Sequence, residues 1–164
     1  MKKYIRPVLI SLLVILALLQ FVRPARNLSN EATNDISRAF AVPADVQHTL
    51  RVSCYDCHSN HTDYPWYAEV QPVGLWLNDH IEEGKDRVNF SEFSAYNLRR
   101  QFHAFEDIDE QVRTGEMPLT SYTLIHRYAI LTPEQQTSVV AWATAMQDTM
   151  KAHYPLDSLL RKKR

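Results

Sequence analysis

The sequence predicts a small all-α domain that follows an apolar N-terminal helix. Apolar residues recur every three or four positions through most of the chain after residue 43, which is the spacing of one helix face. No stretch shows the strict alternation of a β-strand over a convincing length. Only three of the 164 residues are glycine, which argues against a turn-rich β protein. The length accommodates one ordinary domain with an appendage.

Four helices are predicted in the domain. A short one leads into the first cysteine, and a second runs from Pro72 to about Glu83, where Gly84 is expected to stop it. The third covers residues 98–112 and ends before Gly115. The last begins at Thr132-Pro133-Glu134-Gln135, which is a capping box with proline in the first helical position.

Residues 1–26 are predicted to form a single-pass membrane anchor. Lys2, Lys3 and Arg6 precede an apolar run, and the segment from Ile5 to Val22 is long enough to cross a bilayer. No pattern of small residues follows it, so we favour an uncleaved transmembrane helix over a cleavable signal peptide. The basic residues are expected to keep the N-terminal side in the cytoplasm and to place the domain in the periplasm.

The rest of the chain divides by composition and charge. Residues 27–41 are rich in small polar side chains and are predicted to be a linker, residues 42–155 form the domain, and residues 156–164 form a basic tail. Residues 27–160 contain nine basic and 19 acidic side chains, a net charge of −10. This acidic body argues against nucleic acid as a partner and permits a basic protein partner.

Both cysteines of the chain lie in one motif, Cys54-Tyr55-Asp56-Cys57-His58. The spacing C-x-x-C-H is typical of c-type haem attachment. Two thiols about one helical turn apart can bond to the two vinyl groups along one edge of a porphyrin, and the adjacent imidazole can bind the iron. We therefore predict one covalent haem c, with thioether bonds from Cys54 and Cys57 and with His58 as the proximal ligand.

Other uses of the motif explain it less well. A disulfide between these cysteines would close a loop too short to stabilise the fold much, and it would not need His58. A redox-active dithiol usually belongs to a βαβ context, which the sequence does not show. Zinc needs four ligands, and no second Cys/His pair follows at the spacing of a zinc finger.

Two residues compete for the sixth coordination position of the iron. Met117 lies between Gly115-Glu116 and Pro118, and this proline should hold the methionine in an extended loop. Methionine opposite histidine raises the reduction potential and leaves no open site for a substrate. His126 is the alternative, and a bis-histidine iron would have a lower potential.

Aromatic residues follow the motif closely in Tyr64-Pro65-Trp66-Tyr67. Trp66 and Tyr67 are candidates to cover a face of the porphyrin and to exclude water from it. The alternative is that they are ordinary core residues, as clustered aromatic side chains usually are.

In these segments the chain resembles the haem-binding domain family of small, membrane-anchored, c-type cytochrome-like bacterial proteins. The resemblance covers about residues 43–145 and is carried by Cys54-Tyr55-Asp56-Cys57-His58-Ser59-Asn60, Tyr64-Pro65-Trp66-Tyr67, Asn89-Phe90-Ser91, Gly115-Glu116-Met117-Pro118, Tyr122 with His126, and 131–142. It implies a cytochrome-c-like helical domain with haem c bound outside the cytoplasm. It does not identify a redox partner.

The function predicted from these observations is that of a monohaem electron carrier at the outer face of the cytoplasmic membrane. Such a carrier needs no catalytic residue, because electrons enter and leave through the exposed haem edge. Two alternatives remain open. One is a haem peroxidase-like enzyme in which Met117 is displaced or is not a ligand, and the other is a haem-based sensor coupled to the anchor.

Overall fold

The computed structural model describes residues 2–160, and its regular elements there are all helical. The prediction of an all-α fold is therefore confirmed. The α-helices are α1 (Lys2–Leu19), α2 (Ala44–Ser53), α3 (Tyr55–His58), α4 (Val73–Arg87), α5 (Leu98–Thr114), α6 (Thr120–Thr123), α7 (Pro133–His153) and α8 (Leu156–Leu159). Short 3₁₀ helices are η1 (Ile36–Arg38), η2 (Trp66–Glu69), η3 (Phe90–Ala95) and η4 (Arg127–Ala129).

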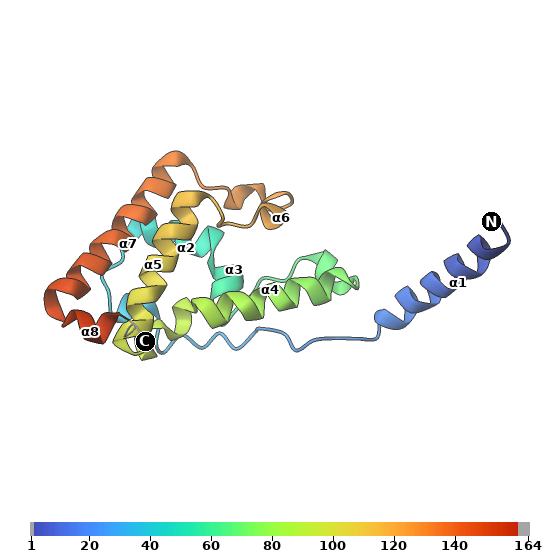
Figure 1. The fold of residues 1–164 in the computed structure, drawn as a ribbon, viewed down its shortest axis with the longest axis horizontal. Helices are drawn as coiled ribbons and strands as arrows, with labels where there is room; N and C mark the ends of the chain where they lie inside the picture. Colours follow the sequence, from blue (N-terminus) through green and yellow to red (C-terminus); the bar gives the residue numbers. More distant parts are fainter. Residues whose placement is uncertain (1, 161–164) are drawn as a thin grey trace.

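Helix α1 extends away from the domain (Figure 1). Most of its large apolar side chains are exposed. Within the described residues, none of the helices combines the length and the apolar character that crossing a membrane requires. The transmembrane helix expected over residues 5–22 is therefore not supported. The helix includes Lys2, Lys3 and Arg6 and ends at Leu19. It therefore contains fewer than the roughly 20 consecutive apolar residues that a membrane-spanning helix needs.

The segment 27–41, expected to be a polar linker, packs against the domain. Asn27 is buried and donates from Nδ2 to the carbonyl of Ser59 (2.8 Å) and to Thr62 Oγ1 (3.0 Å). Ile36, in η1, is only 1% exposed and belongs to the main hydrophobic core. Backbone groups of the segment are bonded to the domain as well, because Asn27 O accepts from the N–H of Thr62 (3.0 Å) and Asn34 O from that of Ser94 (2.9 Å).

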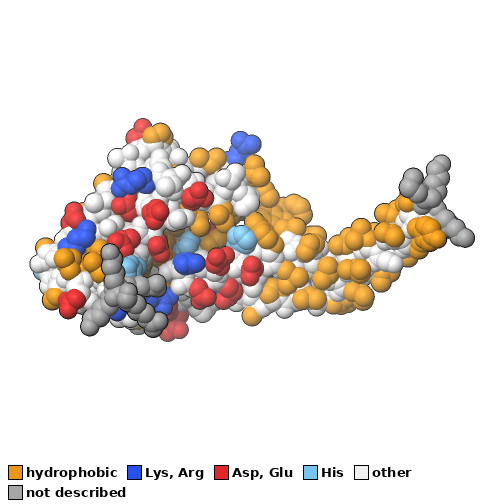
Figure 2. All heavy atoms as spheres, in the orientation of Figure 1, with side chains coloured by type: hydrophobic (Ala, Val, Ile, Leu, Met, Phe, Trp, Pro, Cys, Tyr) orange, Lys and Arg blue, Asp and Glu red, His pale blue; other side chains and the backbone are white. Residues whose placement is uncertain are grey.

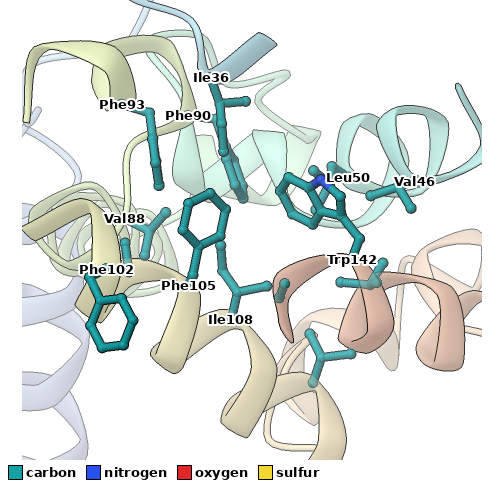
Figure 3. Packing of buried hydrophobic residues seen from close by; sticks show 14 of the residues in the cluster. Ile36, Val46, Leu50, Val88, Phe90, Phe93, Phe102, Phe105, Ile108 and Trp142 are labelled. Atoms are coloured by element: carbon teal, nitrogen blue, oxygen red, sulfur yellow. The ribbon is translucent and has the colours of Figure 1, made fainter. Parts of the chain in front are cut away.

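The main core lies between α5 and α7, which run side by side, and α2 packs against α7 (Figure 1). Phe105 is at its centre, with ring centroids 5.0 Å from Phe93 and 5.5 Å from Trp142 (Figure 3). The indole N–H of Trp142 donates to the carbonyl of Ala41 (3.0 Å), so this large side chain is buried with its polar atom satisfied.

Two of the predicted helix ends are confirmed, and a third differs from the prediction. Helix α5 ends at Gly115, which adopts the left-handed conformation (φ 75°), and α7 begins with the predicted capping box between Thr132 and Gln135. Helix α4 differs from the prediction, because it continues through Gly84 to Arg87. Gly84 is therefore inside a helix instead of ending one.

The predicted C-terminal tail begins with ordered structure. Leu159, in α8, is fully buried in the main core, and α8 packs against α5. The basic residues 161–164, on which the prediction of a tail depended, lie outside the described residues.

Candidate functional site

The C-x-x-C-H motif forms one wall of a cavity of about 480 Å³. Cys54 ends α2 and precedes α3, while Cys57 and His58 lie in α3 itself. The volume is within the range of small-molecule and cofactor sites, about 300–1,000 Å³. Asp56 of α3 lines it too, and the remaining lining residues come from α2, α4, α5, α6 and the segments that follow α4 and α5: Leu50, Ser53, His80, Glu83, Gly84, Arg87, Val88, Phe90, Asp107, Ile108, Gln111, Val112, Met117, Pro118, Leu119 and Tyr122.

His58 is held in one orientation by the backbone that follows α4. Its Nδ1 lies 2.9 Å from the carbonyl oxygen of Val88. A carbonyl can only accept, so Nδ1 carries the proton and Nε2 keeps its lone pair. Burial lowers the pKa of His58 and outweighs the hydrogen bonds to Val88 and Gly84, which act in the opposite direction. The imidazole is therefore neutral near pH 7, which is the form that binds a metal.

The two cysteines are poorly suited to thiol redox chemistry. Burial, together with the neighbouring Cys57, raises the pKa of Cys54 to about 12. Burial and the charge of Asp56 raise the pKa of Cys57 to about 11. Redox-active cysteines have lowered pKa values, because the thiolate is the reacting species. The described residues also contain no cluster of three or more His, Cys, Asp or Glu arranged to hold a metal ion.

Met117 lines the same cavity from the loop that follows α5. Its backbone N–H donates to the carbonyl of Gln111 in the last turns of α5 (3.1 Å), which fixes the start of the loop. Pro118 and Leu119 continue along the cavity wall. The structure thus brings Met117 to the cavity that contains Cys54, Cys57 and His58.

His126 does not line this cavity. Both of its ring nitrogens have partners, because Nε2 lies 2.7 Å from the hydroxyl of Tyr67 and Nδ1 lies 2.7 Å from that of Tyr128. Its ring also stacks on Tyr122, with centroids 4.3 Å apart. His126 therefore connects the loop after α6 to η2.

Trp66 and Tyr67, the predicted pocket aromatics, also lie outside the cavity lining. Trp66 is 78% exposed. Tyr67 is buried in a small second cluster with Leu77 and Ile81, against which Cys57 packs. Tyr67 therefore packs near Cys57 outside the cavity and Trp66 faces solvent, because their segment folds onto α4.

Two contacts of the motif were not anticipated from the sequence. The hydroxyl of Tyr122 donates to Asp56 Oδ2 at 2.6 Å, which ties the loop containing Met117 to α3. Burial and this hydrogen bond raise the pKa of Tyr122. Gly84 lies against α3, and a Cβ atom built on it would be 3.0 Å from the carbonyl oxygen of Cys57. Both contacts join residues far apart in the chain. The sequence gave a signal for only one of them, the glycine at position 84 within a helical pattern.

The chain is similar to a known protein family. The family described as "Haem-binding domain" matches residues 14–145, which is most of the chain. The chain belongs to the haem-binding domain family. No curated protein and no solved structure matched the chain.

The cavity fits the cofactor that gives the haem-binding domain family its name. It contains a neutral histidine with a backbone-fixed Nδ1, as a haem ligand requires. Much of its lining is apolar, which suits a large flat porphyrin: Leu50, Val88, Phe90, Ile108 and Val112. Arg87 also lines the cavity and could pair with the carboxylates of a haem, whereas the acidic Asp56, Glu83 and Asp107 would repel them.

Proposed function

We propose that this haem-binding protein is a monohaem c-type cytochrome that carries electrons. In this proposal Cys54 and Cys57 form thioether bonds, His58 is the proximal ligand and Met117 is the distal ligand. One observation carries it: the two thiols, the neutral imidazole and the thioether of Met117, from two segments about 60 residues apart, line a single cavity. Bound haem would supply a reversible one-electron change at iron.

The side chains around the cavity have defined tasks in this proposal. The carbonyl of Val88 orients His58 and increases the basicity of its Nε2. The contact between Tyr122 and Asp56 holds the Met117 loop against α3. Apolar residues such as Ile108 and Val112 exclude water, which together with methionine ligation favours a higher reduction potential.

Covalent attachment is tested by mass spectrometry of the protein produced in a host that matures c-type cytochromes. The denatured wild-type chain is expected to carry the mass of one haem. A Cys54→Ala/Cys57→Ala variant should lose it, while a Ser53→Ala variant, altered beside the motif on the same cavity wall, should keep it. A wild-type chain with only the polypeptide mass would refute c-type attachment.

The distal ligand is tested by the optical spectrum and the reduction potential. Met117→Ala should abolish the weak long-wavelength band of sulfur bound to ferric iron, and should lower the potential. His126→Ala should leave both unchanged, because the ring of His126 is outside the cavity. A Met117→Ala spectrum identical to that of a high-spin wild type would exclude methionine ligation and favour an enzyme with an open site.

We also propose that the domain is held at the periplasmic face of the cytoplasmic membrane by α1. Large apolar side chains of α1 are more than half exposed in the described structure, including Ile5, Val8, Leu13 and Leu18. Basic residues at its start, such as Arg6, suit anionic lipid. Flotation of the full chain with phospholipid vesicles should be lost when residues 1–19 are deleted, and equal flotation of both chains would refute this role of α1.

A further inference from the structure

A second apolar surface lies at the end of the domain closest to α1. It consists of Trp66 in η2, Val70 and the first residues of α4, Val73 and Trp76, and we call it the α4-start patch. The exposed fractions of the four side chains are 78%, 46%, 39% and 43%. Two exposed tryptophans in one patch are unusual for a surface in contact with water alone.

Hydrogen bonds hold the patch next to the end of α1. The side chain of Gln20 donates to the carbonyl of Gln71 (3.0 Å) and accepts from its backbone N–H (3.1 Å). Arg23 donates to the carbonyl of Glu69 (2.9 Å), and Arg26 forms an ion pair with the Glu69 carboxylate. Gln71 lies between Val70 and Val73, so α1 is joined to the domain within the patch itself.

The apolar surface is continuous from α1 to this end of the domain. Phe21 and Val22 follow α1 and are 84% and 47% exposed. Figure 2 shows hydrophobic side chains along α1 and across the adjoining end of the domain, whereas charged side chains are numerous on the visible face farther from α1, with hydrophobic ones among them. The surface is therefore mostly hydrophobic near α1 and becomes more charged along the long axis of the molecule.

We propose that the α4-start patch rests in the interfacial region of a phospholipid bilayer, as a second contact beside α1. This inference rests on the proposed membrane association of α1. Lipid fits because tryptophan favours the boundary between headgroups and acyl chains, where its ring is buried and its N–H stays hydrated. Arg23 and Arg26, beside the patch, are paired with Glu69 but remain 52% and 44% exposed, which leaves guanidinium N–H groups for lipid phosphates.

The contact would set the height of the haem cavity above the membrane. Helix α4 carries Trp76 of the patch and, eight residues later, Gly84 of the cavity wall. Eight residues of helix rise about 12 Å. The ring of Trp76 is 4.2 Å from that of His80, which itself lines the cavity. A docked patch would thus place the His80 end of the cavity beside the bilayer, with Gly84 on the order of 10 Å farther along α4.

The experiment places a photoreactive benzoylphenylalanine at single positions in the full-length, haem-containing chain. Positions 66 and 76 probe the patch, position 18 probes α1, and position 156 is the matched control, since Leu156 is an exposed apolar residue (56%) of α8, outside the patch. Each variant is mixed with vesicles of phosphatidylethanolamine and phosphatidylglycerol, irradiated and analysed by mass spectrometry. Haem content is measured before irradiation.

Phospholipid adducts at positions 18, 66 and 76, and none at 156, are the expected result. Adducts at 18 without adducts at 66 and 76 would overturn this inference and leave the membrane role of α1 intact. No adduct at any position would overturn both. Equal adducts at 66 and 156 would show unspecific contact, and an adduct with the mass of a second chain at 66 would assign the patch to a dimer; either result would overturn it. The haem proposal is judged separately by the mass before irradiation.

Discussion

Gly84→Ala tests whether the close approach of α4 and α3 matters for the site. A Cβ atom at residue 84 would lie 3.0 Å from the carbonyl oxygen of Cys57 and 3.4 Å from Cε1 of His58. Neither neighbour is the free end of a flexible chain, because one is backbone and the other is an imidazole bonded to Val88. The added methyl group should therefore push α3 and α4 apart by a few tenths of an ångström.

Two effects of opposite sign determine how Gly84→Ala changes the free energy of unfolding. Alanine is a better helix former than glycine by about 1 kcal/mol in a helix interior. Adding a methyl group to a close contact costs about 1–3 kcal/mol. The net expectation is a destabilisation of up to about 2 kcal/mol, with a central value near 1.

The measurement is urea unfolding of the haem-containing chain, followed by far-UV circular dichroism. With a slope of about 2 kcal/mol/M, a loss of 1 kcal/mol lowers the midpoint by about 0.5 M. Glu82→Ala, at an exposed position of the same helix, is the control and should shift the midpoint by less than about 0.3 M. A midpoint that rises for Gly84→Ala would mean that helix propensity dominates and that the contact with Cys57 and His58 is not tight.

Three further results are expected. Tyr122→Phe should lower the free energy of unfolding by about 1–2 kcal/mol, because the Asp56 carboxylate loses a 2.6 Å hydrogen bond, whereas Tyr154→Phe should not. Asp107→Asn should raise the melting temperature slightly at pH 7 and have no effect below about pH 4. Asp107 is exposed, but partial desolvation raises its pKa in the folded chain, so its ionised form opposes folding once the pH rises above the unfolded pKa of about 4. An equal effect at both pH values would contradict this. Trp66→Ala should leave the haem spectrum and potential unchanged, and a shift in either would place this ring at the haem.

The sequence alone indicated the elements whose signals are local. The stop of α5 at Gly115 and the capping box of α7 depend on residues within one helical turn, and both appear as predicted. The haem prediction came from five consecutive residues, Cys54 to His58, and the family match over residues 14–145 also supports haem binding. Short-range geometry requires particular residues at particular spacings, so it can be recognised without the fold.

The tertiary structure decided which segments meet, because long-range contacts leave little trace in one sequence. Met117 and His126 are both plausible ligands by type, but the fold places one at the cavity and gives the other two tyrosine partners. Trp66 was a plausible pocket residue by type, but η2 folds onto α4 and leaves this side chain outside the cavity. Gly84 had the pattern of a helix stop, yet it allows two helices to approach. In each case the residue type suits several environments, and only packing selects one of them.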